Sequence, residues 1–289
     1  MQQRKLRIGI KSRDSGLGIV RRRFSDIKQF MGAISWAFNS VRQKGLVRTA
    51  KVATSVIADL SFDWRYGTET TRWVLEDDLG AVGENRIHSV RYQPTKARPL
   101  RNLLNSLNLP RDRVFVDLGS GKGRVLLIAA QCGFQRIVGV EFSPELCEST
   151  RQNVEIFRRK CGLTARIDIV MSDVTRYRIQ PEQSIFFMYN PFDAVVMEQV
   201  VANLRRSLEL APRPVWLIYN TPLCQHIIEK AGMFTNRLFR EIGGTSFIVY
   251  ANTEQMGTRL VGSNHPAGKP PQPPFPRGGA GPTSQHAGL

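Results

Sequence analysis

Short apolar runs alternate with segments of helical periodicity between residues 113 and 251. The apolar runs are RVFVDL (113–118), RIVGVEF (136–142), RIDIVMSDV (166–174), SIFFMYN (184–190) and VWLIYN (215–220). Segments with three- and four-residue apolar spacing separate them, at residues 123–133, 144–162, 193–209 and 222–232. Short runs that alternate with helices in this way indicate a doubly wound, mostly parallel α/β sheet.

Local signals mark the boundaries of several elements. Ser143 stands before Pro144 and Glu145, which is typical of a helix N-cap followed by its first turn. We expect that helix to end near Gly162 and to bury Leu146, Thr150, Val154 and Phe157. The pair Gly243–Gly244 separates RLFREI from TSFIVYA and is a two-residue hairpin signal. We therefore expect a Rossmann-like sheet of seven strands whose last strand is antiparallel.

The two ends of the chain follow other patterns. Apolar residues recur at helical spacing over 24–60, so this stretch either packs on the main domain or lies on a membrane or on RNA. Beyond residue 252 the chain is dense in Pro and Gly and almost free of aliphatic residues, which favours disorder. The expected organisation is a basic, partly helical extension (1–60), a main domain (61–252, with a lid or helical segment 61–110 and a sheet core 111–252) and a tail (253–289).

Charge adds a possible class of partner. The chain of 289 residues carries a formal net charge of +17, and residues 1–50 hold twelve Lys/Arg against two Asp. Such an arm suits a polyanion or an anionic surface, or it is simply solvated. The four cysteines form no CxxC pair, which argues against a zinc cluster or a disulfide framework and fits a reducing, cytoplasmic setting. No apolar run approaches the roughly 18 residues of a membrane span, and we see no secretory signal.

The stretch VFVDLGSGKGRVLL (114–127) carries the first chemical signal. It places a glycine-rich loop between a strand and a helix, where open α/β sheets bind ligands and where a ligand could lie against backbone N–H groups. A phosphate-binding Walker loop needs Ser or Thr after its Lys, but Gly123 follows Lys122. A dinucleotide fingerprint needs a third glycine where Arg124 stands. What remains is DxGxGxG, from Asp117 to Gly123.

Two further acids end the next two predicted strands. Glu141 lies 24 residues after Asp117, where a carboxylate can accept both ribose hydroxyls of a nucleoside. Asp173 ends the following strand and could accept from an adenine amino group, with Val174 or Met171 against the ring. A single acid at a strand end is often only a cap or a solvated side chain. Three acids at successive strand ends beside a glycine loop favour a nucleoside-containing ligand.

These motifs resemble those of the class I S-adenosylmethionine-dependent methyltransferases. The segments that carry the resemblance are VDLGSGKGR (116–124), GVEFSPEL (139–146), SDV (172–174) and YNPF (189–192). Upstream, FDWRYGTET (62–70) and YQPT (92–95) resemble segments of an uncharacterised bacterial subgroup, and DLGSGKGR is also similar to non-SET protein lysine methyltransferases. The cofactor contacts implied are Asp117 near the methionine amino group, Gly119 and Gly121 on the methionine part, Glu141 on the ribose and Asp173 on the adenine. Ser120, Gly123, Phe142, Val174 and Thr95 complete the expected cofactor site, although Thr95 also fits the N-cap of the helix that leads to the first strand.

The methyl acceptor is less defined. Asn190, Pro191 and Phe192 are similar to the Asn/Asp-Pro-Pro-aromatic signature of enzymes that methylate amino or amide nitrogen, although one Pro is missing. The alternative is that this segment only turns the chain out of the sheet. YGTET (66–70) would fold over the cofactor as a lid, with Glu69 orienting an amine or removing its proton. Equally, Thr68 or Thr70 would only cap a helix that begins near Trp73.

We therefore expect an enzyme that transfers a methyl group from S-adenosylmethionine to a nitrogen of a macromolecule, with protein preferred on the resemblance. RNA and small molecules remain alternatives, and so does a non-catalytic nucleic-acid-binding module of the same fold. We expect no metal, because the histidines at 88, 226, 265 and 286 have no ligand spacing.

Overall fold

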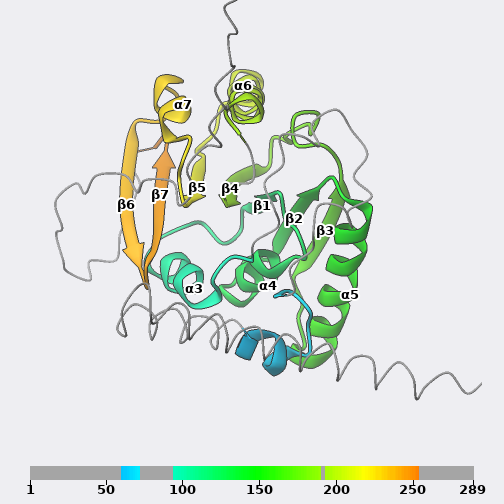
Figure 1. Ribbon diagram of the computed structural model, residues 1–289. Helices are drawn as coiled ribbons and strands as arrows, with labels where there is room; N and C mark the ends of the chain where they lie inside the picture. The colour runs from blue at the N-terminus through cyan, green and yellow to red at the C-terminus, as the bar shows by residue number, and fades with distance from the viewer. Residues whose placement is uncertain (1–59, 72–93, 190–192, 254–289) are drawn as a thin grey trace, which may run out of the picture. The chain divides into compact units, whose positions relative to one another are not determined.

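The computed structural model describes residues 60–71, 94–189 and 193–253 (Figure 1). The chain divides into two compact units, Met1–Ile57 and Ala58–Leu289, and all the described residues belong to the second. The predictions for the N-terminal extension and the tail lie outside these ranges, apart from Leu60 and Thr253. Within the described ranges, no helix is long and apolar enough to cross a membrane.

A mixed sheet of seven strands forms the centre of this unit. The strands are β1 (Val114–Leu118), β2 (Arg136–Glu141), β3 (Arg166–Met171), β4 (Gln183–Tyr189), β5 (Trp216–Asn220), β6 (Asn236–Ile242) and β7 (Thr245–Ala251). They lie in the order β3-β2-β1-β4-β5-β7-β6. Strands β1 to β5 are mutually parallel, whereas β7 runs antiparallel to both of its neighbours. The predicted fold class is confirmed.

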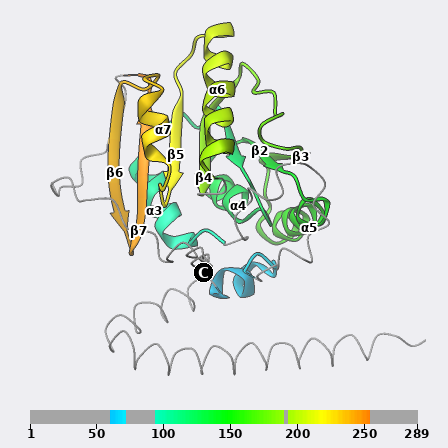
Figure 2. The ribbon, with the colours of Figure 1, turned by 45° about the horizontal axis from the view of Figure 1, so that its top comes forward.

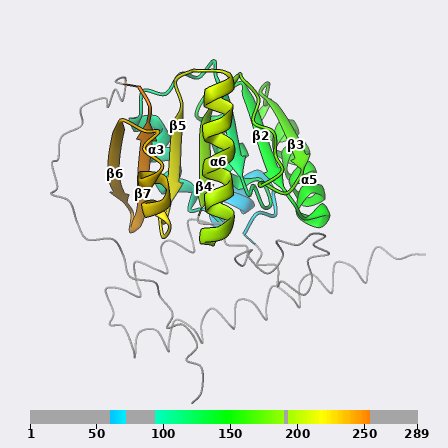
Figure 3. The same cartoon turned by 90° about the horizontal axis from the view of Figure 1, so that it is seen from above.

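Helices cover the sheet on both faces (Figures 2 and 3). Their bounds are α3 (Ala97–Ser106), α4 (Arg124–Gln131), α5 (Pro144–Cys161), α6 (Ala194–Leu210) and α7 (Gln225–Lys230). One hydrophobic core joins the sheet to α3, α4 and α5 and includes Leu103, Leu127 and Phe157. The other joins it to α6 and α7 and includes Val200 and Ile228. Because both faces are covered, the central strands are apolar throughout rather than alternating.

The local signals account for several element boundaries. The Ser143 hydroxyl accepts from the amide of Leu146 at 3.2 Å and caps α5. The helix ends at Gly162, whose φ of 60° is left-handed. Gly243 and Gly244 have φ of 57° and 70°, as a tight turn between β6 and β7 requires. The residues predicted to face inward on α5 are all buried, as are Val196, Val200 and Leu204 on α6.

One predicted cap is wrong. The N-cap of α3 is Lys96, and the structure shows no side-chain cap there. Thr95 is instead buried, and its carbonyl oxygen lies 3.4 Å from Nη1 of Arg124. That contact joins segments far apart in the sequence, which a local capping rule does not consider.

The strand order brings the predicted site residues to one edge. Parallel strands end at the same edge of a sheet, so the carboxyl ends of β1 to β5 lie in a row. The chain leaves β1 toward β2 and β3 on one side and reaches β4 and β5 on the other. This switch point is where open α/β sheets bind ligands.

The glycine loop offers a test of the packing. A Cβ built on Gly123 would lie 2.6 Å from Cγ2 of Thr150, and its φ of +82° is unfavourable for other residues. Gly232 has a φ of +65°, but a Cβ there would meet nothing within 4 Å. Both Ala variants incur left-handed strain of about 1–2 kcal/mol. Only Gly123→Ala adds overpacking, about 1–3 kcal/mol more. Urea unfolding should therefore show the larger loss for Gly123→Ala, and equal losses would contradict this packing.

Candidate active site at the carboxyl edge of the sheet

The glycine loop leaves β1 immediately after Asp117. Gly119, Gly121 and Gly123 all have left-handed φ angles, of 85°, 53° and 82°. Three such angles in five residues are accessible at low cost only to glycine. Of residues 119–123, Gly119 alone is exposed, whereas the other four are buried. Within the loop, Gly119 is therefore the place where a ligand can approach the backbone.

The loop amides are already bonded within the protein. The N–H groups of Gly119 and Ser120 both donate to the carbonyl oxygen of Val140, at 2.9 and 3.0 Å. Gly123 donates to the carbonyl oxygen of Ser120 at 2.9 Å, and Gly121 donates to the Glu141 carboxylate. These four amides therefore already have acceptors within the protein, and the contact of a ligand with the loop backbone stays a prediction. The glycines provide the turn and the close approach, and their donors fix the loop to β2.

Glu141 connects the loop to the turn that follows β2. Its Oε2 accepts from the amide of Gly121 at 2.8 Å, and its Oε1 accepts from Phe142 and Ser143 at 3.0 and 3.1 Å. A carboxylate offers about four acceptor positions, so these three bonds leave one on Oε2. Burial raises the pKa of Glu141, and the three amides partly oppose that rise. To accept both ribose hydroxyls, the Glu141 carboxylate would have to lose one of its three hydrogen bonds from backbone amides.

Asp117 is the other buried acid at this edge. Its side chain is 2 % exposed, and its Oδ2 has no hydrogen-bond partner in the structure. Burial raises the pKa of Asp117 well above its ordinary value, and the negative charge of Glu141 raises that pKa further. An unpartnered carboxylate oxygen in such a place costs free energy unless a donor reaches it. Ser120 beside it is also buried, with an unpartnered hydroxyl oxygen.

Asp173 follows β3 and is half-buried. Its Oδ1 accepts from both the amide and the hydroxyl of Thr175, each at 2.8 Å, so the side chain shapes the turn after the strand. Phe142 and Val174 are also half-buried, and Met171 is exposed. The turns after β2 and β3 thus present partly open residues, while the carboxylates of Asp117 and Glu141 are buried.

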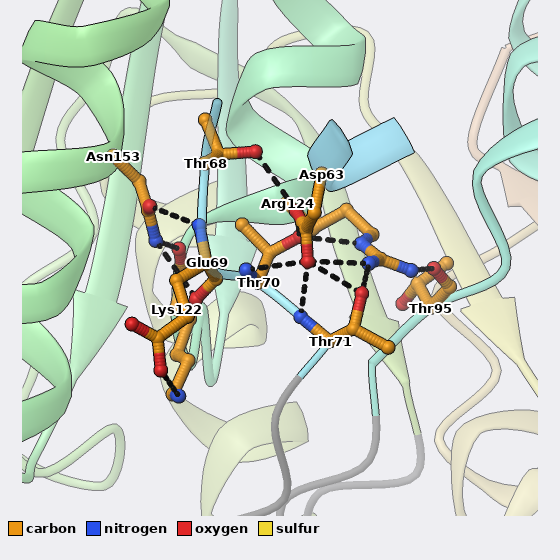
Figure 4. A network of polar contacts seen from close by, with 9 residues as sticks. All are labelled: Asp63, Thr68, Glu69, Thr70, Thr71, Thr95, Lys122, Arg124 and Asn153. Atoms are coloured by element: carbon orange, nitrogen blue, oxygen red, sulfur yellow. Dashed lines mark hydrogen bonds and ion pairs between the residues drawn. The ribbon is translucent and has the colours of Figure 1, made fainter. Parts of the chain in front are cut away.

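A second polar cluster lies where the YGTET segment meets the loop (Figure 4). Asp63, on the helical residues 60–66, accepts hydrogen bonds from both hydroxyl and amide groups of the segment. The donors are the hydroxyls of Thr68, Thr70 and Thr71 and the amides of Thr70 and Thr71. The hydroxyls of Thr68 and Thr70 therefore serve Asp63. The helix near Trp73, which the alternative interpretation had Thr68 or Thr70 cap, lies outside the described residues.

Arg124 joins this cluster to the first turn of α4. The residue is 2 % exposed, and its guanidinium lies 5.3 Å from the ring centre of Phe62. Its Nε donates to the Thr70 hydroxyl at 2.7 Å, and its Nη2 lies 3.5 Å from Oδ2 of Asp63. The side chain that replaces the third glycine of a dinucleotide fingerprint thus holds residues 68–71 against the glycine loop.

Helix α5 supports the same junction from its side. The Asn153 amide exchanges two hydrogen bonds with the backbone of Glu69, at 2.8 and 3.3 Å, and donates to the carbonyl oxygen of Lys122 at 3.1 Å. The Thr150 hydroxyl donates to the carbonyl oxygen of Gly121 at 2.7 Å. The Glu69 side chain is 67 % exposed, with its carboxylate 3.9 Å from Nζ of Lys122.

The structure therefore gathers some expected residues and adds others. It places Asp117, the glycines and Glu141 together, with Asp173 two strands away on the same edge. Asn190, Pro191 and Phe192 lie outside the described residues, as do the first two residues of YQPT (92–95). Sequence reasoning missed three residues, Asp63, Arg124 and Asn153. The first two stood within motifs quoted for the resemblance, whereas nothing in the pattern distinguished Asn153 from an ordinary buried helix residue.

Comparisons with known proteins identify the family. Residues 88–205 match the family model "Histone methylation protein DOT1". A protein-lysine N-methyltransferase of Saccharolobus islandicus is 34 % identical over 163 residues, which cover 56 % of this chain and 91 % of that protein. The chain belongs to the class I S-adenosylmethionine-dependent methyltransferases. It is accordingly an enzyme, and its cofactor is S-adenosylmethionine, as the motifs predicted.

Other similarities to this methyltransferase are shorter or weaker. The mouse adenine nucleotide translocase lysine N-methyltransferase is 44 % identical over 57 residues, covering 20 % of this chain and 24 % of that protein. The structure of an RNA methyltransferase from Salinibacter ruber with S-adenosyl-L-homocysteine is 20 % identical, with a TM-score of 0.40, and covers 57 % of this chain and 96 % of that one. These two similarities do not show which class of molecule receives the methyl group.

The raised pKa of Asp117 makes the stability of the methyltransferase depend on pH. Between the ordinary value of 3.8 and the higher folded-state pKa, the folded protein binds a proton that the unfolded chain has lost. Stability therefore falls as the pH rises through this window. Asp117→Asn removes the titrating group and should raise the melting temperature at pH 7, with a smaller difference near pH 4. An Asp117→Asn variant that melts lower than wild type at pH 7 would contradict this account.

The Asp63 cluster should hold residues 68–71 in place. Asp63→Asn removes the charge opposite Arg124 and turns an amide donor toward other donors, which should destabilise the enzyme by about 3–5 kcal/mol. Asp168→Asn is a matched control, because its ion pair with Arg166 is exposed and worth about 1 kcal/mol or less. Urea unfolding measures both losses. Hydrogen exchange at residues 68–71 should quicken in Asp63→Asn alone, and unchanged exchange there would refute the role of Asp63.

Proposed function

We propose that this enzyme methylates the side-chain amine of lysine in a protein. The observation that carries the proposal is the similarity to the Saccharolobus islandicus protein-lysine N-methyltransferase, which extends over 91 % of that protein's length. The match to the histone methylation family over residues 88–205 supports the same acceptor class. The proposal places the reaction in the cytoplasm. It also gives the basic N-terminal arm a role in binding the macromolecule that carries the lysine.

The residues at the carboxyl edge fit S-adenosylmethionine. The unpartnered Oδ2 of Asp117 suits the methionine ammonium, which would supply the missing donor and offset the buried charge. The acceptor position left on Oε2 of Glu141 suits a ribose hydroxyl, and Asp173 with Val174 would hold the adenine. Exposed Gly119 would approach the methionine part. We retain Ser120, Gly121, Gly123, Phe142 and Thr95 as residues that shape or contact this site.

On the acceptor side, the protein needs mainly to align an amine and exclude water. When bound, the cofactor supplies an electrophilic methyl group on a sulfonium, which is already a good leaving group. We propose that Asn190 and the backbone beside Pro191 hold the amine while Phe192 packs against it. Glu69, whose carboxylate is exposed, would orient the ammonium or take its proton before transfer.

The experiment is transfer of tritiated methyl from S-adenosylmethionine into a cell lysate, followed by separation of protein, RNA and small molecules. We expect label in protein and, after acid hydrolysis, in methylated lysine. Glu141→Gln should reduce labelling by at least tenfold by weakening cofactor binding, whereas Glu148→Gln on the exposed face of α5 should not. Label in RNA or in small molecules would refute the lysine proposal and leave the methyltransferase assignment intact.

A further inference from the structure

The end of β5 holds an unusual backbone conformation. Thr221 has a φ of +51°, and it is the one non-glycine residue with positive φ in the described ranges. A β-branched residue is strongly disfavoured there, because its Cβ crowds the backbone. Thr221 also precedes Pro222, which restricts it further. Strain of this kind persists only where the surroundings enforce it, and it gathers at functional sites.

Hydrogen bonds on both sides of Thr221 hold its backbone in this conformation. The amide of Thr221 donates to the carbonyl oxygen of Ser246 on β7 at 2.8 Å. The amide of Cys224 donates to the hydroxyl of Tyr219 at 3.2 Å, and Tyr219 itself is fully buried. Pro222 is buried as well. The turn is therefore anchored on both sides of the strained residue.

The strained residue fixes the side chain before it. Asn220 is the last residue of β5 and is 1 % exposed. Its Oδ1 accepts from the Thr221 hydroxyl at 3.2 Å, while its Nδ2 has no hydrogen-bond partner among the described residues. Within the described residues, the amide thus uses only one lone pair of its oxygen and can accept a further donor. Such a group is retained more readily where a ligand completes its bonding.

The position of Asn220 along the sheet edge indicates which ligand. If adenine lies at β3, ribose at β2 and methionine at β1, the reactive methyl points onward to β4 and β5. Asn220 pairs in register with Tyr189, the last residue of β4, directly before Asn190. An amine that attacks a methyl must turn its lone pair toward the carbon, so its N–H groups need acceptors on the other side. The Asn220 Oδ1 has a second lone pair for this purpose.

We propose that Asn220 is part of the acceptor site: its amide oxygen accepts an N–H of the amine that receives the methyl, and the strained Thr221 is the positioning residue that orients this amide. The proposal rests on the proposed nitrogen acceptor and adds a second polar contact from β5 to that expected from Asn190.

The test uses the full chain and the variants Asn220→Leu, Thr221→Gly and, as an exposed control, Asn105→Leu. We expect Asn220→Leu to bind S-adenosyl-L-homocysteine as wild type does and to melt only slightly lower, because the amide has one hydrogen bond to lose, that from the Thr221 hydroxyl. Tritiated methyl transfer to lysate protein at saturating cofactor should fall by at least tenfold. Thr221→Gly should raise the melting temperature while transfer falls, and Asn220→Gln should restore part of the rate.

The outcomes separate this inference from the proposed function. Wild-type labelling of RNA or small molecules would overturn the lysine proposal, and Asn220→Leu would still slow that transfer. Normal transfer by Asn220→Leu would overturn the inference alone. If wild type labels nothing, the melting temperature of Asn220→Leu decides. A large drop makes the amide a structural partner and defeats the inference, whereas an equal or only slightly lower value supports it.

Discussion

The Glu141 carboxylate is the interaction on which the candidate active site depends. It lies buried between the glycine loop and the start of α5, and it accepts one amide from the loop and two from the turn after β2. Three backbone donors surround one charge, so the loop conformation and the ionised carboxylate stabilise each other. The same oxygen that holds Gly121 is the one with an acceptor position left for a ligand.

Asp117 stands in contrast to Glu141 although both are buried acids on adjacent strands. Glu141 has amide donors, whereas Oδ2 of Asp117 has none, and their charges repel each other. Burial therefore raises the pKa of both, and it raises that of Asp117 without compensating hydrogen bonds. A site of this kind is less stable when empty at neutral pH, and a cationic ligand relieves the cost. The family's cofactor carries such a cation in its methionine ammonium.

A second constraint ties the upstream segment to the sheet. Arg124 is buried among Thr70, Thr71 and Asp63, and Asn153 holds the backbone of Glu69. The YGTET segment thus meets the glycine loop through polar bonds, while its first residue, Tyr66, packs against Phe157 of α5. Its threonine hydroxyls donate to the half-buried carboxylate of Asp63, which explains why polar residues recur at this spacing.

The pattern of the chain determined the mostly parallel direction of the strands, the caps of α5, the hairpin between β6 and β7, and the acids at the ends of β1 and β2. These features depend on neighbours in sequence or on rules for parallel sheets, so a pattern can express them. The partners of Asp63 and Arg124, the bonded amides of the loop and the strained Thr221 emerged only with the tertiary structure. Each depends on atoms that meet across tens of residues, such as Arg124 with Thr70 or Thr221 with Ser246, and the chain carries no local signal for such meetings. The physical reason is burial, because a charge or hydroxyl that is removed from water needs a hydrogen-bond partner. Which partner lies close enough depends on the folded structure and not on neighbours in sequence.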